Sequence, residues 1–569
     1  MPDIDHPHGR WRERIARGDN AAMRGVPRLL ILVSILAWGC GGGDDGGSVG
    51  DDSGANDGGD PGDGAGDPGD DGADGDDSGD DGEPPPPVAV CADPVEPVDT
   101  SRPDRIVGDG SAASCTEADL AAALAAGGVV TFACGDQPVT IAVTAPLVVT
   151  DDTVVDGADL VTLDGGDATR ILELASSFDL DTPSLTVQRM RFERGNSPAG
   201  GDDTEVGGGA IYKRGGALTV IDSTFVDNHA PATGQDVAGG AIYGFGGGPV
   251  VIVGSSFSRN SASDGGAVGS LQTDLTIVNS TLADNAATGT GGNPGNGGAG
   301  GAVYLDGTDQ VTVLCGAALR DNRAGAIGGG LFRVSNTGDG TFAMDASSVS
   351  GNQVPAGAES SLAGGMYLQG LAITITASTI SANQADYGGG VWLGQDTTVD
   401  ITNVTIAGNR ALAFHGGGLW LAGEPTGTLL NVTITGNQSS GDDGQAGAIF
   451  GPGDGLTIKN AIIDGQSVGN PFSPISCDQA HADGGGNVQW PVQREEGGSD
   501  DPDALCAAGA LVADPMLVGL SDNGGPTLTS APASQSPAIG LGTGCPETDQ
   551  RGLPRGEPCT SGAVEVAAD

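Results

Sequence analysis

The stretch Gly208-Gly209-Ala210-Ile211-Tyr212, followed by Phe225-Val226-Asp227-Asn228, decides the fold, because both of its motifs recur along the chain. Counterparts of the glycine motif begin at Gly239, Gly300, Gly329, Gly364, Gly389 and Gly417. The asparagine recurs as Asn228, Asn260, Asn285, Asn322, Asn352, Asn383, Asn409 and Asn437. Successive asparagines lie 25 to 37 residues apart, a period that indicates stacked coils rather than a row of separate domains.

The residues before each asparagine predict two short strands joined by a bend. Three positions earlier the residue is always apolar: Phe225, Phe257, Leu282, Leu319, Val349, Ile380, Ile406 and Ile434. The positions eight and ten earlier are also mainly apolar, which is the period-two alternation of a strand. Six positions earlier stand mostly residues that tolerate a left-handed backbone: Asp222, Gly254, Asn279, Gly316, Ala346, Ala377, Asn403 and Asn431.

The glycine motif supplies a third strand, so the expected fold is all-β: a single-stranded, right-handed parallel β-helix. With coils about 4.8 Å apart, we expect about eight to eleven coils in a rod of about 40–50 Å. The asparagine amides are expected to form a structural ladder by bonding to one another and to buried backbone. A short helix from Thr116 to Gly127, with Thr116 as N-cap, is expected to cover the open ladder edge of the first coil.

One column of the third strand is aromatic and is the candidate binding ladder. It consists of Tyr212, Tyr243, Tyr304, Phe332, Tyr367, Trp392, Trp420 and Phe450. Its neighbours on either side, such as Ile211 and Leu305, are aliphatic, so by alternation the rings are expected to point outward. An exposed stripe of rings would stack on sugar rings or on a partner protein. Two alternatives stay open: glycine-rich loops cover the column, or the rings form an internal stack.

The charge of the chain excludes whole classes of partner. The 569 residues carry a formal net charge of −52, which repels nucleic-acid phosphates and anionic lipid headgroups alike. The chain contains 103 glycines and 33 prolines, far more than an ordinary helical globule contains.

The N-terminal residues predict export. The apolar run Leu29–Ala37, preceded by two arginines, has the length of a signal-peptide core rather than of a membrane span. Translation from Met23 would give a leader of ordinary length. The run ends in Leu36-Ala37-Trp38-Gly39-Cys40, which resembles a bacterial lipobox. That resemblance implies lipidation of Cys40, which would then be the membrane anchor, although Trp38 is atypical; the alternative is simple secretion.

The cysteines are consistent with an oxidising compartment. Without Cys40, eight remain in a chain expected to be exported, where disulfides persist. The local pairs Cys115–Cys134, Cys477–Cys506 and Cys545–Cys559 are plausible. Because Cys315 shares the column of Ile221, Val253 and Val278, we expect it to be a buried free thiol.

Two resemblances add to these inferences. The GGAI and FxxN motifs are similar to the repeats of polymorphic outer-membrane proteins and related pectin-lyase-like β-helix proteins. Asp522–Thr529, Ser536–Gly542, Asp549–Arg555 and Ser561–Glu565 resemble the choice-of-anchor Q domain, although Gly540 and Val564 depart from its pattern. The implied organisation is a lipoprotein signal region (1–39), a Gly/Asp-rich tether (40–90), an N-terminal cap with the first coils (91–184), the β-helix repeats (185–470) and a C-terminal module (471–569).

Catalytic residues do not emerge from the sequence. A polysaccharide lyase or hydrolase needs clustered carboxylates on outward positions of adjacent coils, and the outward columns hold no acid pair. His229, His415 and His481 are scattered without metal-ligand spacing, so no metal or cofactor is expected. We expect a lipid-anchored protein of the bacterial cell envelope, an outer-membrane lipoprotein, that binds a polysaccharide or a surface protein without catalysis. The alternatives are an enzyme whose site lies in the loop with Asp202, Asp203 and Glu205, or a structural spacer.

Overall fold

The computed structural model describes residues 89–200, 203–358, 360–491 and 505–567, all within one compact unit, Asp80–Asp569. The leader, Cys40 and the tether up to residue 88 lie outside the described residues. Within the described part no helix is long and apolar enough to cross a membrane.

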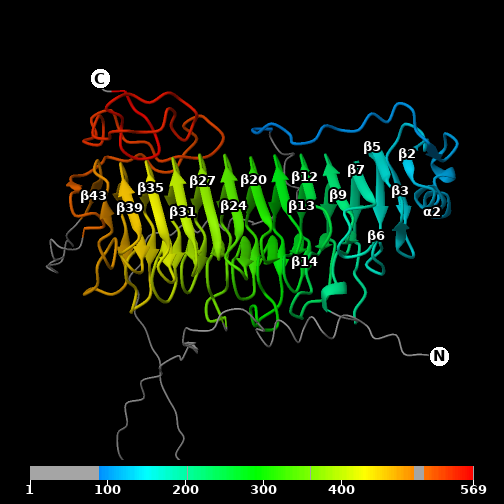
Figure 1. The fold of residues 1–569 in the computed structure, drawn as a ribbon, viewed down its shortest axis with the longest axis horizontal. Helices are drawn as coiled ribbons and strands as arrows, with labels where there is room; N and C mark the ends of the chain where they lie inside the picture. Colours follow the sequence, from blue (N-terminus) through cyan, green and yellow to red (C-terminus); the bar gives the residue numbers. More distant parts are fainter. Residues whose placement is uncertain (1–88, 201–202, 359, 492–504, 568–569) are drawn as a thin grey trace, which may run out of the picture. The chain divides into compact units, whose positions relative to one another are not determined.

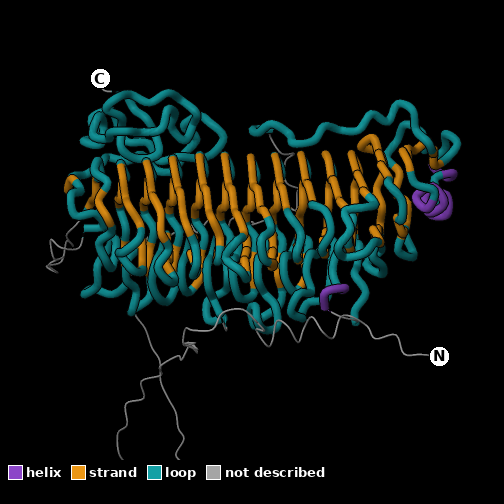
Figure 2. Tube along the Cα trace, in the orientation of Figure 1, coloured by secondary structure: helices purple, strands orange, loops and turns teal. Residues whose placement is uncertain are grey.

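The described unit is a parallel β-solenoid of about 13 turns, as Figures 1 and 2 show, and this confirms the predicted fold class. Each full coil contributes one strand to an 11-stranded sheet and two strands to a 26-stranded sheet. Several coils add a two-residue strand after the asparagine, in two small sheets that the sequence did not predict. All inter-coil pairings between named strands are parallel, so every coil serves as template for the next.

The strands of the 26-stranded sheet that precede the bend, or lie in the terminal coils, are β1 (Arg105–Val107), β2 (Gly128–Phe132), β3 (Val139–Ala142), β5 (Thr153–Asp164), β7 (Ser184–Glu193), β9 (Ala217–Ile221), β12 (Val250–Val253), β16 (Leu275–Val278), β20 (Val311–Cys315), β24 (Gly340–Asp345), β27 (Leu371–Thr376), β31 (Thr398–Thr402), β35 (Thr426–Leu430), β39 (Leu456–Lys459) and β42 (Ala482–Asp483). The strands that follow the bend are β10 (Thr224–Val226), β13 (Ser256–Ser258), β17 (Thr281–Ala283), β21 (Ala318–Arg320), β25 (Ser348–Ser350), β28 (Thr379–Ser381), β32 (Thr405–Ala407), β36 (Thr433–Thr435), β40 (Ile462–Asp464), β43 (Val488–Trp490) and β44 (Leu511–Val512).

The 11-stranded sheet consists of β4 (Leu147–Val149), β6 (Leu172–Ala175), β8 (Ile211–Arg214), β11 (Ile242–Phe245), β15 (Val268–Leu271), β19 (Val303–Gly307), β23 (Leu331–Ser335), β26 (Met366–Gln369), β30 (Val391–Leu393), β34 (Leu419–Leu421) and β38 (Ile449–Phe450). The small sheets consist of β14 (Ser261–Ala262), β18 (Ala286–Ala287) and β22 (Arg323–Ala324), and of β29 (Gln384–Ala385), β33 (Arg410–Ala411), β37 (Gln438–Ser439) and β41 (Ser467–Val468). The helical segments are η1 (Ala112–Ser114), α2 (Glu117–Ala125) and η2 (Asp203–Glu205).

The predicted registry is confirmed. Phe225 pairs with Phe257, and Phe257 with Leu282, in adjacent coils. The rings of Phe225 and Phe257 are stacked with centroids 4.6 Å apart, and all three side chains are fully buried in one core. At the bend six residues before each asparagine the backbone is left-handed, with φ of 47° at Asp222 and Asn279 and similar values along the column. This conformation is why glycine and asparagine are frequent there.

The asparagines form one buried column. The Nδ2 group of each donates to the Oδ1 atom of the next at 2.9–3.0 Å, from Asn228 through to Asn437. Gln466, which the sequence reading missed, continues the column, because its Oε1 atom accepts the backbone N–H of Asn437 at 2.9 Å. A second column lies at the bend, where serine hydroxyls such as those of Ser255 and Ser378 accept backbone N–H groups from the preceding coil.

The capping helix lies where it was predicted. Thr116 is the N-cap and its side chain accepts the N–H of Asp119 at 3.2 Å. Leu120 and Leu124 are buried against β1, β2 and β4, the first strands of the solenoid. The expected number of coils was too low, because coils before β9 and after β40 lack the glycine and FxxN motifs but keep the strand pairing.

The described unit contains four disulfides. The three local pairs predicted from the sequence are confirmed. The prediction for Cys315 was wrong: it is bonded to Cys91, 224 residues earlier. The sequence did not predict this bond because it depends on a long-range contact. The N-terminal segment 89–104, here called the strap, folds back along the bends of the coils (blue in Figure 1). Further along the same row of bends lie residues of the C-terminal module (red in Figure 1).

Candidate functional site

The aromatic column occupies one register position of the 11-stranded sheet. Tyr212 pairs with Tyr243 and Tyr304 with Phe332, and the column continues through Tyr367, Trp392 and Trp420 to Phe450, interrupted at Gly269. The aliphatic neighbours of the rings belong to the main core, whereas the buried rings form a separate cluster outside it. The rings therefore face away from the solenoid interior and are not an internal stack.

The N-terminal half of the column is covered. Tyr212, Tyr243, Tyr304 and Phe332 are 0–4% exposed, packed with Ala238, Ala299 and Ile327 from the connections that precede the strands of this sheet. For these four rings, the expectation of an exposed stripe is wrong and the alternative of covering loops holds. Glycine makes the close approach possible, since a Cβ at Gly207, where φ is 152°, would lie 2.7 Å from the Tyr243 ring.

Polar contacts tie two of these loops down. The guanidinium of Arg170 donates to the carbonyls of Glu205, Gly207 and Gly208, and lies 4.4 Å from the centroid of the Tyr212 ring. The Tyr304 hydroxyl donates to Asp236 at 2.9 Å and accepts from the Asn293 amide at 2.6 Å. Burial raises the pKa of the Tyr304 hydroxyl well above its usual value, so this phenol stays protonated and can donate.

The C-terminal half of the column is partly exposed. Tyr367, Trp392, Trp420 and Phe450 all keep solvent access. Tyr367 and Trp392 stack with centroids 6.0 Å apart, and Trp392 and Trp420 stack at 4.8 Å. The Phe450 ring lies 4.5 Å from that of Trp420 and is tilted by 52° against it. The connections directly before Trp392 and Trp420 are short: residues 386–390 between β29 and β30, and residues 412–418 between β33 and β34.

Three further rings extend this exposed half, and the sequence reading missed them. Tyr387 and Phe414 stack at 4.0 Å, Tyr387 packs edge-on against Trp420 at 5.4 Å, and His415 lies 4.4 Å from Phe450. Tyr387 and His415 each directly precede a glycine triplet, a position held by small or aliphatic residues in most other coils. The aromatic residues at this position were the sequence signal by which these rings could have been predicted. We call the seven partly exposed rings the open ring face: Tyr367, Tyr387, Trp392, Phe414, His415, Trp420 and Phe450.

The open ring face is uncharged near neutral pH. Burial raises the pKa of Tyr367 to about 12, and its hydroxyl donates to Gln369 at 2.8 Å. Burial also lowers the pKa of His415, which keeps the imidazole neutral. Flat apolar rings bordered by an amide suit stacking against the C–H face of a sugar, with hydrogen bonds at the margin.

The loop expected to carry an alternative catalytic site offers little chemistry in its described part. Asp202 and the side chain of Asp203 lie outside the described residues. The carboxylate of Glu205 lies 3.6 Å from the guanidinium of Arg214, and its backbone carbonyl is held by Arg170. Glu205 is therefore an ion-paired residue of a loop that covers Tyr212.

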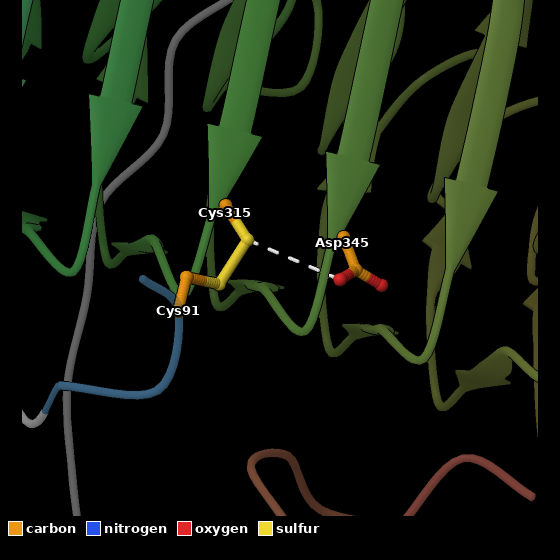
Figure 3. Close-up of side chains that lie close together, drawn as sticks. All are labelled: Cys91, Cys315 and Asp345. Atoms are coloured by element: carbon orange, nitrogen blue, oxygen red, sulfur yellow. Dashed lines mark hydrogen bonds between the residues drawn. A yellow bond between two sulfur atoms is a disulfide. The ribbon is translucent and has the colours of Figure 1, made fainter. Parts of the chain in front are cut away.

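One group of potential metal ligands occurs among the described residues: Cys91, Cys315 and Asp345 (Figure 3). A carboxylate oxygen of Asp345 lies 3.9 Å from the Cys315 sulfur. Because the two sulfurs form a disulfide, they are not thiolates and do not provide metal ligands.

Two arginines of the C-terminal module, Arg551 and Arg555, make structural contacts. Arg551 donates to the buried carboxylate of Asp549, and Arg555 donates to Asn403 of the solenoid at 2.7 Å. Arg551 borders a cavity of about 540 Å³ whose other lining residues include Leu553, Pro554 and Pro558. The arginines thus hold the module together and onto the coils.

Comparisons with known proteins define no family for this chain. No protein-family model matches it, and no curated relative does. The A-module of the Azotobacter vinelandii mannuronan C-5 epimerase AlgE6 aligns at 16% identity over 68% of this chain and 100% of its own, with a TM-score of 0.41. The AlgE4 A-module of the same organism aligns at 16% identity over 66% and 99%, with a TM-score of 0.34. PfbA, a surface adhesin of Streptococcus pneumoniae, aligns at 13% identity over 68% and 94%, with a TM-score of 0.29.

These similarities do not define a ligand or an activity for this chain. The resemblances to polymorphic outer-membrane repeats and to the choice-of-anchor Q domain stay predictions.

Proposed function

We propose that this protein is a lipid-anchored binding protein of the bacterial cell envelope, held at the outer membrane through Cys40, that captures an uncharged glycan on its open ring face. One observation carries the proposal: seven partly exposed rings gather on four consecutive coils, whereas the other rings of the same column are covered. An exposed aromatic patch of this kind is typical of a binding surface.

The charge of the protein favours an uncharged ligand. A net charge of −52 repels polyanionic chains at long range, and no arginine or lysine belongs to the open ring face. Stacking on aromatic rings does not require a charged ligand, because it depends on contact area and on the ring quadrupole.

Trp392→Ala and Trp420→Ala test the proposal. Each change removes a large stacking surface, so we expect retention on an immobilised neutral glycan to fall by about tenfold or more, as for the loss of a central aromatic anchor. Trp490→Ala is the matched control, because Trp490 is 39% exposed but belongs to β43, outside the open ring face. The measurement is a glycan-array screen followed by titration of tryptophan fluorescence.

Equal glycan binding by the wild-type protein, W392A and W420A would contradict the proposal. Turnover of the glycan, detected by product analysis, would instead favour the enzyme hypothesis, whereas the absence of any glycan binding would favour a protein ligand or a spacer.

A further inference from the structure

The strap is attached to the middle of the solenoid rather than to its first coil. Cys91 is bonded to Cys315 at the end of β20, and the Cα atoms lie 6.0 Å apart (Figure 3). Beside the disulfide, the Asn279 side chain accepts the N–H groups of Val90 and Cys91 at 2.8 and 2.9 Å, and donates to the Cys91 carbonyl at 2.8 Å.

From this point the strap runs back toward the N-terminal coils. Val98 exchanges two hydrogen bonds with the side chain of Gln188 on β7, and the Thr100 hydroxyl donates to Asp156 on β5. The coils of β5 and β20 are five steps apart, about 24 Å at the usual strand spacing. Residues 91–100 can span about 30 Å when extended, so the strap covers this distance with about 6 Å to spare.

The strap does not join the sheet. Pro94, Pro97 and Pro103 lack the N–H group that a ladder requires, which keeps the segment extended but unpaired as a strand. It is therefore held by a few side-chain hydrogen bonds, each worth about 1 kcal/mol, and by one covalent bond.

We propose that Cys91–Cys315 is a mechanical clamp that directs tension from the N-terminal tether into the coil of β20. Tension arriving at Cys91 passes through the disulfide to Cys315, so the chain between them, which includes α2 and the strands up to β19, carries no load. Without the disulfide the same tension would pass through the strap to β1 and peel the coils from their N-terminal end. The physiological role of the clamp rests on the proposed anchoring at Cys40, whereas its mechanics do not.

Single-molecule force spectroscopy tests the clamp on the protein held by residues N-terminal to 89 and by its C-terminus. We compare the wild-type protein with C91S/C315S, and with wild-type protein reduced only after folding and attachment, in case the double variant folds poorly. The freed chain comprises the 224 residues of the large loop less the 19 still held by Cys115–Cys134. We expect the fully extended length of C91S/C315S to exceed that of the wild type by roughly 70 nm.

Two further cysteine pairs provide matched controls. C115S/C134S should leave the wild-type extension unchanged, because that disulfide lies in the shielded loop, but should add roughly 6–7 nm in the C91S/C315S background. C477S/C506S, outside the loop, should add roughly 10 nm in both backgrounds. In the reduced protein all these increments should appear together, with roughly 5 nm more from Cys545–Cys559.

The clamp is overturned if the wild type and C91S/C315S reach the same length, or if C115S/C134S lengthens the wild type by itself. Because the pulled protein needs no lipid, a failure of anchoring at Cys40 would leave these lengths unchanged and would be recognised separately, by release of the protein from membranes.

Discussion

At the scale of single residues, the solenoid interior contains two cations among aliphatic side chains. Lys213 and Arg333 share a column with Leu305 and Leu368, and both are fully buried. The Lys213 ammonium donates to the Gly246 carbonyl and, at 3.1 Å, to the Thr273 hydroxyl, but no carboxylate contacts it among the described residues. Desolvation lowers the pKa of Lys213 to about 7 and that of Arg333 to about 10.

Lys213 should therefore make stability depend on pH. The unfolded lysine keeps its proton up to about pH 10.4, whereas the folded one loses it near pH 7. Between these values the unfolded state binds more protons, so the free energy of unfolding should rise with pH. Lys213→Met should lose this rise and exceed the wild type in stability below pH 7, by a few kcal/mol. The measurement is the urea midpoint from pH 6 to 10, with Lys459→Met, at a partly exposed lysine, as control. A midpoint difference between K213M and wild type that does not change with pH would contradict this.

At the scale of elements, α2 protects the first coil from other chains. An open ladder edge pairs readily with a second copy, and α2 covers this one by burying Leu120 and Leu124. Leu120→Asp places a carboxylate in that contact, which costs more than the 2–5 kcal/mol of a simple truncation to alanine. We expect the helix to detach and the protein to form oligomers whose mass, measured by light scattering, rises with concentration. Ala122→Asp, on the exposed face of the same helix, should remain at the wild-type mass. A monomeric L120D protein would show that another segment covers the edge.

At the scale of the whole described unit, the strap and the C-terminal module cover different parts of the same row of bends. The strap contacts the coils from β2 to β20, and the module contacts those from β27 onward. Gln550 is central to the second contact, because its amide donates to Ser378 and Thr379 and accepts from the Thr405 hydroxyl. Four rings of the open ring face, Tyr367, Trp392, Trp420 and Phe450, lie on the 11-stranded sheet, whereas both covers lie along the bends of the 26-stranded sheet.

Gln550→Ala should loosen the module without unfolding the solenoid. The change leaves buried partners without a hydrogen bond, which costs about 1–3 kcal/mol. We expect faster hydrogen exchange at the bends around residues 376–380 and 403–406, and unchanged exchange at β9 and β12. Gln137→Ala, at an exposed glutamine, serves as control. Unchanged exchange at those bends in Q550A would indicate that other contacts suffice to dock the module.

The sequence by itself determined the coil. Each coil requires period-two alternation, a left-handed residue at the bend and an asparagine at a fixed distance from both, and all three are local features of the sequence. Because a slip of one residue would turn the apolar side chains outward, this pattern also specifies the registry between coils. The same local signals located α2 and the column of outward rings.

Only the tertiary structure decided which rings are open and where Cys315 finds its partner. The burial of Tyr212, Tyr243, Tyr304 and Phe332 depends on the way in which loops pack across neighbouring coils. The open ring face also includes Tyr387, Phe414 and His415, which come from a different part of each coil. Cys91 meets Cys315 because the strap reverses along the coils, a long-range contact that no neighbouring residue of either cysteine encodes.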